Sequence, residues 1–142
     1  DPEGGGEEEG RGRKRANLAT KLEGDEKILA LKMALKTADL GYLTKGGHLV
    51  LTWTDRVLEE FFTQGDTEKR LGLPVSFGCN RDTVDLPESQ LGFYNFMVQP
   101  LYEAMNLLCP MNQQLANLDA ARQHWLREKT KASKKTDCRQ VK

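Results

Sequence analysis

The sequence lacks any long hydrophobic run and most of the motifs that mark common active sites. No stretch of about 18 apolar residues occurs, so we expect no membrane-spanning helix. There is no H-E-x-x-H, Walker, G-x-S-x-G or Cys/His zinc pattern. The acidic, glycine-rich start does not resemble a signal peptide. These absences leave no enzyme class indicated by a short motif.

Cysteine is scarce, and neither sign of charge is in excess. Cys79, Cys109 and Cys138 stand far apart with no C-x-x-C pair, which indicates a reducing compartment and predicts a cytoplasmic protein. The chain carries 21 Lys and Arg against 21 Asp and Glu, for a net charge of +0. This balance argues against a dedicated nucleic-acid-binding protein.

Both ends of the chain are polar and lack apolar side chains to bury. Residues 1–16 hold five acids and four bases, and residues 128–142 hold six bases and two acids. We therefore predict a disordered charged tail at 1–17, one folded domain at 18–127 and a disordered basic tail at 128–142. The basic tail has no interleaved aromatic residues, so a nucleic-acid or membrane-surface binder is the least favoured hypothesis.

The spacing of apolar residues between the tails is helical throughout. Residues 25–39 predict a helix with one broad buried face, and residues 48–64 predict a second. A short helix is predicted after Asp66, and residues 112–127 predict a last one. No strand-like alternation occurs, so the predicted fold class is all-α, a helical bundle.

One long apolar helix and the loop before it complete this organisation. The helix is predicted at 89–108, with a kink or break at Pro100. Residues 73–87 show no period and read as a long loop, a kind of segment that is often functional. The apolar side chains exceed what such a short chain can bury, so we expect exposed apolar patches and self-association through them.

Few polar residues stand out as candidates for chemistry. His48 and His124 are far apart in unrelated contexts, so neither is assigned a catalytic role. Asp39 ends an apolar helix, where the dipole disfavours a carboxylate and a cation partner would stabilise it. Gln90 and Phe93 share one helix face, as an amide and a ring that recognise a base would do. An exposed first-turn glutamine is the simpler interpretation of Gln90 from spacing alone.

Four stretches of the chain carry a more specific signal. They are ADLG, WTDRVLEEFFTQGDTEKRLGLP, ESQLGFYNF and QPLYEAMNLL, and they lie between about Asp25 and Trp125. Together they resemble the class I 3′,5′-cyclic-nucleotide phosphodiesterases. The resemblance implies the helical C-terminal part of a truncated catalytic domain. The family function that it implies is metal-dependent hydrolysis of cAMP or cGMP to the 5′-monophosphate in signal transduction.

The resemblance assigns a purine-binding role to six residues. Gln90 corresponds to the glutamine that recognises the purine edge, Phe93 to the stacking ring and Val57 to the aliphatic side of the clamp. Three others are implied to line or border the pocket: Trp53, Thr54 and Phe61. We therefore expect Val57 and Phe93 to face each other across a gap wide enough for a purine. Preference between cAMP and cGMP is left open, since an amide presents either a donor or an acceptor.

The resemblance also implies a centre of two divalent ions, Zn together with Mg or Mn. Asp39 corresponds to its last protein ligand, but the family's H-N-x-x-H and H-D-x-x-H motifs do not occur in this sequence. We therefore expect no catalytic residue in this chain, and we expect the metals not to be retained by it. The alternative to the enzyme hypothesis is a non-catalytic helical interaction fragment or a defective paralogue.

Overall fold

The computed structural model describes residues 20–140, with side chains described through residue 134. The elements are α2 (Gly24–Asp39), η1 (Gly41–Thr44), α3 (His48–Arg70), α4 (Leu86–Phe93), η2 (Tyr94–Val98), α5 (Gln99–Met105) and α6 (Asn112–Gln140). No strand occurs among these described residues, which confirms the predicted all-α class. The predicted disordered tail at 1–17 lies outside the described residues.

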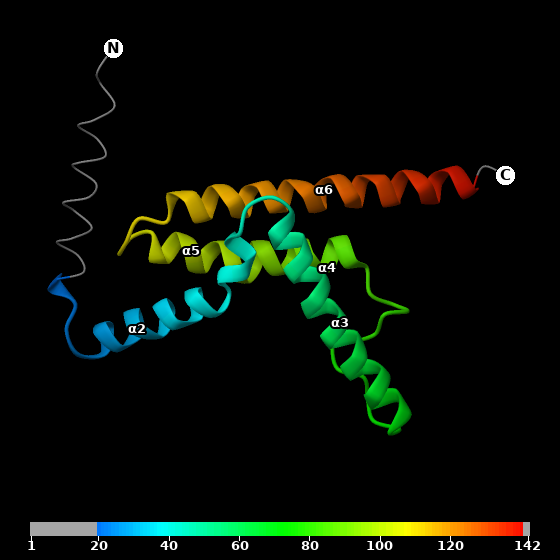
Figure 1. The fold of residues 1–142 in the computed structure, drawn as a ribbon, viewed down its shortest axis with the longest axis horizontal. Helices are drawn as coiled ribbons and strands as arrows, with labels where there is room; N and C mark the ends of the chain where they lie inside the picture. The colour runs from blue at the N-terminus through cyan, green and yellow to red at the C-terminus, as the bar shows by residue number, and fades with distance from the viewer. Residues whose placement is uncertain (1–19, 141–142) are drawn as a thin grey trace, which may run out of the picture.

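One helical rod forms the centre of the fold. It consists of α4, η2 and α5, which follow one another directly and lie antiparallel to α6 (Figure 1). Helices α2 and α3 diverge on the side of the rod away from α6 (Figure 1). The short η1 turn joins them and contacts α6, so it fixes where both helices leave the rod.

The core gathers where these elements meet. Tyr94, Val98, Tyr102 and Leu43 are its most deeply buried side chains. They pack with the inner face of α6, which contributes buried leucine, alanine and tryptophan side chains: Leu118, Ala121 and Trp125. Burial of these apolar groups supplies the main stabilising term of a fold this small.

The expected interruption at Pro100 takes a milder form. Pro100 is the second residue of α5, and a π-helical turn, η2, directly precedes it. Proline has no N–H and its ring crowds the carbonyl four residues earlier, whereas a wider turn relieves that crowding. The helical path therefore continues past Pro100 without a break, with its irregularity one turn earlier than predicted.

Two predicted helix boundaries are wrong. The break predicted near Gly65 does not occur, because α3 continues to Arg70 as one helix. Helix α6 runs to Gln140, past its predicted end at Arg127, and so includes most of the segment predicted as a basic tail. Lysine, alanine and glutamate favour helix there, and the ion pairs Lys131–Glu128 and Lys129–Glu88 support it.

The apolar face of α2 is exposed, which corrects the prediction of a broad buried face. Thr37 is the buried residue of this helix, while Ile28, Leu31 and Leu35 are 52%, 66% and 74% exposed. The reason is positional, since α2 diverges from the rod and packs on α5 and η1 (Figure 1). These side chains form the exposed apolar surface that the composition predicted.

Tyr102 connects the rod to the end of α2, and its hydroxyl can be tested. It is 1% exposed and donates to the Thr37 carbonyl at 2.8 Å, one of the last carbonyls of α2, which lack helical partners. Tyr102→Phe leaves that carbonyl unpaired, so we expect the free energy of unfolding in urea to fall by about 1–2 kcal/mol. Tyr94→Phe is the matched control, because the buried Tyr94 hydroxyl has no partner among the described residues. An equal loss in both variants would contradict this role of Tyr102.

Candidate functional site

A cleft of about 1430 Å³ opens among the described residues. Its lining comes from four parts of the structure: the end of α2 with η1, one face of α3, α4 from Glu88 to Phe93, and the segment 75–85. We call this last segment the cleft wall. Since these parts are distant in sequence, the fold is what creates the cleft.

All seven candidate residues line this one cleft. They are Asp39 at the end of α2, the α3 residues Trp53, Thr54, Val57 and Phe61, and the α4 residues Gln90 and Phe93. The two predicted sides of the purine clamp, Val57 and Phe93, thus belong to the same cavity. Their separation across a purine-sized gap stays a prediction.

Helix α3 presents a stripe of large apolar side chains to the cleft. Trp53, Val57 and Phe61 lie one turn apart, and both aromatic rings remain nearly half exposed. The Arg56 guanidinium lies 5.2 Å from the centre of the Trp53 ring. Thr54 differs from these, since it is buried and its hydroxyl donates to the Val50 carbonyl at 2.9 Å. The stripe therefore offers an apolar surface to a ligand.

Helix α4 places an amide in the cleft just after its first turn. Asp85 caps this helix by accepting from the Glu88 N–H at 3.1 Å, and Pro87 follows the cap. Gln90 is 8% exposed, so it is not the exposed first-turn glutamine of the simpler interpretation. Its side-chain amide has no hydrogen-bond partner among the described residues. Phe93 lies one turn further, half-buried against the core. The Gln90 amide is not among the fully buried polar atoms that lack a partner, so it is open to the cleft and available to a polar ligand.

Asp39 lies at the cleft in an exposed position. Its side chain is 70% exposed, and the expected cation partner is Lys36, at 3.8 Å. Burial, and to a lesser degree the Asp39 carboxylate, raises the pKa of the Tyr42 phenol, which also lines the cleft. Within residues 20–134, no group of three His, Cys, Asp or Glu side chains is arranged to hold a metal ion. The described residues therefore do not fit a two-ion centre.

The two histidines lie apart from this site. His48 begins α3 and is exposed, while His124 lies on α6 with its ring 5.1 Å from that of Trp125, edge to face. His124 borders a separate cavity of about 210 Å³ between α6 and the start of α3. Neither histidine is among the residues that line the cleft.

The cleft wall was not identified residue by residue from the sequence. It contributes hydroxyl, amide and apolar groups to the cleft: Val75, Ser76, Phe77, Asn80, Thr83 and Val84. The sequence predicted residues 73–87 only as a long loop, a kind of segment that is often functional. The signal that could have revealed it is the density of opposite charges, with Glu59, Asp66 and Lys69 on α3 facing Arg81 and Asp82 of the wall.

Comparison with known proteins identifies the family. The sequence model of the 3′5′-cyclic nucleotide phosphodiesterases matches residues 8–119, so the match begins and ends earlier than the resemblance from about Asp25 to Trp125. The chain is 37% identical over 102 residues to "Probable 3′,5′-cyclic-AMP phosphodiesterase pde-4" of Caenorhabditis elegans. It is 43% identical over 83 residues to "Dual specificity calcium/calmodulin-dependent 3′,5′-cyclic nucleotide phosphodiesterase 1C" of Mus musculus.

These matches cover much of this chain and little of the relatives. They span 71% and 58% of the chain, but only 15% of the nematode protein and 12% of the mouse protein. The structure of LmjPDEB1 in complex with IBMX shares the fold, with a TM-score of 0.67 at 24% identity over 85% of this chain and 38% of that one. The family match spans more than half of the sequence and confirms the resemblance. The chain belongs to the 3′5′-cyclic nucleotide phosphodiesterase family.

Proposed function

We propose that the cleft is the base-binding part of a cyclic-nucleotide phosphodiesterase site. The purine of cAMP or cGMP lies between Phe93 and the α3 stripe, and the Gln90 amide hydrogen-bonds its edge. The observation that carries this proposal is Gln90 itself, a residue only 8% exposed that lines a cleft with aromatic rings and whose amide forms no hydrogen bond with the described residues. An apolar slot with a few fixed polar groups is typical of small-molecule sites.

The proposed reaction is hydrolysis of the 3′ ester bond of the cyclic phosphate to give the 5′-monophosphate. The names of the relatives, cyclic-AMP phosphodiesterase and dual specificity cyclic nucleotide phosphodiesterase, support this substrate class. Two divalent ions, Zn with Mg or Mn, would polarise the phosphate in a complete site. We propose Asp39 as one carboxylate ligand there, although the residues of this chain do not make that centre. The chain's own contribution is to bind and orient the base.

Binding is testable without catalysis, because Trp53 lines the cleft and its fluorescence reports occupancy. Trp125 lies in the core and gives a constant background. We expect cAMP and cGMP to change the emission of the unmodified chain in a saturable manner. The change should disappear in Trp53→Phe, while isothermal calorimetry still detects binding. No binding by either method would contradict the proposal.

Phe93→Ala should weaken purine binding strongly. Stacking of a base on an aromatic ring contributes about 1–3 kcal/mol, so we expect the Kd for cAMP to rise roughly tenfold or more. Phe96→Ala is the matched control, since Phe96 lies one turn away, is exposed and does not line the cleft. Calorimetric titration of both variants measures the effect. An unchanged Kd in F93A, or an equal loss in F96A, would contradict the assignment of Phe93.

A second function, as a helical interaction module, is favoured by the exposed α2 face of Ile28, Leu31 and Leu35. We propose that this face associates with another copy of the chain when the chain is isolated. Sedimentation equilibrium measures that association directly. We also propose a cytoplasmic location, which the free thiols of Cys79 and Cys109 support. No helix within the described residues is long and apolar enough to cross a membrane.

A further inference from the structure

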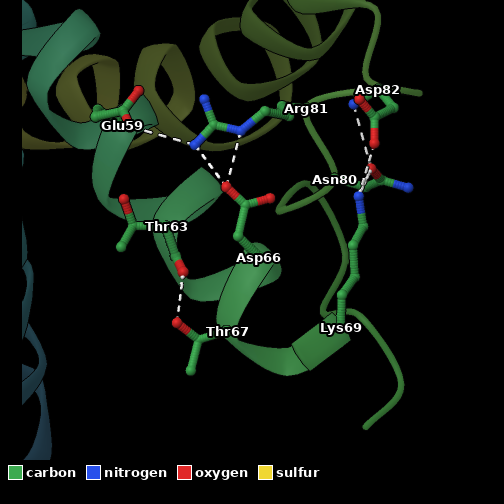
Figure 2. Close-up of polar contacts among 8 residues, drawn as sticks. All are labelled: Glu59, Thr63, Asp66, Thr67, Lys69, Asn80, Arg81 and Asp82. Carbon is green, nitrogen blue, oxygen red and sulfur yellow. Dashed lines mark hydrogen bonds and ion pairs between the residues drawn. The ribbon is translucent and has the colours of Figure 1, made fainter. Parts of the chain in front are cut away.

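The cleft wall is held on α3 by a guanidinium that joins two turns of that helix. Figure 2 shows Arg81 of the wall reaching back to the side chains of Glu59 and Asp66. Its Nε donates to Asp66 Oδ2 at 3.0 Å, and Nη2 lies 2.8 Å from the same oxygen and 3.2 Å from Glu59 Oε1. The guanidinium carbon also lies 5.2 Å from the centre of the Phe62 ring. One side chain of the wall thus contacts three residues of α3.

A second set of contacts orders the backbone on both sides of Arg81. Lys69 donates from Nζ to Asn80 Oδ1 and to Asp82 Oδ2, each at 2.8 Å (Figure 2). Asn80 Oδ1 also accepts the Asp82 N–H at 3.2 Å, and its carbonyl accepts from the N–H groups of Thr83 and Val84. The Lys69 ammonium lowers the pKa of the Asp82 carboxyl through this hydrogen bond. Residues 80–84 are therefore a folded turn.

The start of the wall has its own attachment. Glu68 accepts from the Ser76 N–H and hydroxyl, each at 2.7 Å, and from the Gln64 amide at 2.9 Å. These donors, with Gln64 first, lower the pKa of the Glu68 carboxyl. Ser76 and Asn80 both line the cleft. The wall residues that bind Glu68 and Lys69 of α3, Ser76 and Asn80, therefore also border the space proposed for the ligand.

The wall reaches α3 on the stripe that carries the proposed ligand contacts. Gly65 follows Trp53, Val57 and Phe61 at the same four-residue spacing, so it continues their stripe. The backbone of Cys79 packs directly on Gly65, where an added Cβ would lie 2.0 Å from the Cys79 carbonyl oxygen. The wall therefore closes the end of the aromatic stripe. Because several wall residues line the cleft, the position of the wall affects the shape of the cleft.

We propose that Arg81 is a positioning residue for the cleft, because its ion pairs with Asp66 and Glu59 fix the wall at the end of the aromatic stripe. This inference rests on the proposed function for its ligand, a purine cyclic nucleotide. Arg81 touches no ligand and acts through the wall residues on either side of it. A planar guanidinium is required, because a lysine ammonium is a point charge that does not present the same fork to two carboxylates. Each ion pair is solvent-exposed and contributes little to the free energy of unfolding by itself. We therefore expect Arg81 to affect the local order of the wall rather than the stability of the whole fold.

The test measures wall order and ligand affinity separately. In Arg81→Ala, we expect amide hydrogen exchange of residues 79–84 to rise about fivefold, the size typical of losing one exposed ion-pair network. The Kd for cAMP should rise by a similar factor, while exchange in α6 and the urea midpoint stay unchanged. Lys131→Ala is the matched control, since it removes an ion pair with Glu128 on α6 away from the cleft. Arg81→Lys should restore only part of the affinity.

The outcomes separate this inference from the proposed function. Unchanged amide hydrogen exchange of the wall in R81A would overturn the positioning role, regardless of the Kd measured for cAMP. Faster wall exchange with an unchanged Kd would overturn it as well, since the wall would then not set the affinity. An unmodified chain that binds no purine would contradict the proposed function, and the exchange measurement would still decide whether Arg81 holds the wall. Asp66→Asn, which keeps the side-chain shape, should reproduce the R81A exchange pattern, and a normal pattern there would contradict the pairing.

Discussion

Purified protein of this sequence will release no 5′-monophosphate from cAMP or cGMP with Mg²⁺ or Mn²⁺ above a heat-treated control. The reason is the set of side chains available to hold ions. A catalytic centre of two divalent ions needs several nitrogen and oxygen ligands at one place. Three carboxylates line the cleft: Asp39, which is 70% exposed and paired with Lys36, and Asp85 and Glu88 at the start of α4. Asp85 caps α4 and Glu88 pairs with Lys129, and no group of three His, Cys, Asp or Glu side chains within the described residues is arranged to hold a metal ion.

The histidines of the chain do not supply the missing ligands. His48 and His124 are the two that the sequence contains, and neither lines the cleft. Chromatographic separation of nucleotide products over many hours gives the needed sensitivity. Turnover that persists through purification and is lost in Asp39→Asn would overturn the prediction, while turnover unaffected by that change would indicate a contaminant. We therefore expect this polypeptide to bind the purine of a cyclic nucleotide without hydrolysing its phosphate ester.

The candidate site was largely predictable because its residues lie on regular elements. Trp53, Val57 and Phe61 repeat every four residues, and Gln90 and Phe93 are three apart, so each group falls on one helix face. Resemblance to the phosphodiesterases linked the two groups, and the structure brings both to one cleft. Periodicity alone reports which residues share a helix face, but it does not report which faces meet.

The cleft wall could not be predicted residue by residue, because side-chain contacts between distant positions hold it. Lys69 and Asn80 are 11 positions apart, and Glu59 and Arg81 are 22 apart. No helical or strand period relates such pairs. The end of α6 was missed for a related reason, since Lys129 pairs with Glu88 on α4. A charge run that reads as a solvated tail becomes part of a helix when another element supplies its partners.

Gly65→Ala should disrupt the cleft wall more than any change of its surface charges. Glycine normally weakens a helix interior, and Gly65 falls between the helices predicted at 48–64 and after Asp66. In the structure it lies within α3 where Cys79 packs on the helix. An alanine Cβ would lie 2.0 Å from the Cys79 carbonyl oxygen and 2.7 Å from its carbon, so the backbone itself must move. Cys79 is buried, so this movement carries the rest of the wall with it.

The same substitution at Gly92 gives the comparison that isolates this contact. Gly92 lies within α4, and no atom stands within 4 Å of its added Cβ, so Gly92→Ala should raise the free energy of unfolding by up to about 1 kcal/mol. Gly65→Ala should lower it by about 1–3 kcal/mol, because overpacking outweighs the gain in helix propensity. Urea unfolding measures both, and hydrogen exchange locates the loss at residues 76–84. Stabilisation by both alanines would show that the wall does not pack on Gly65, and the end of the cleft would then be open.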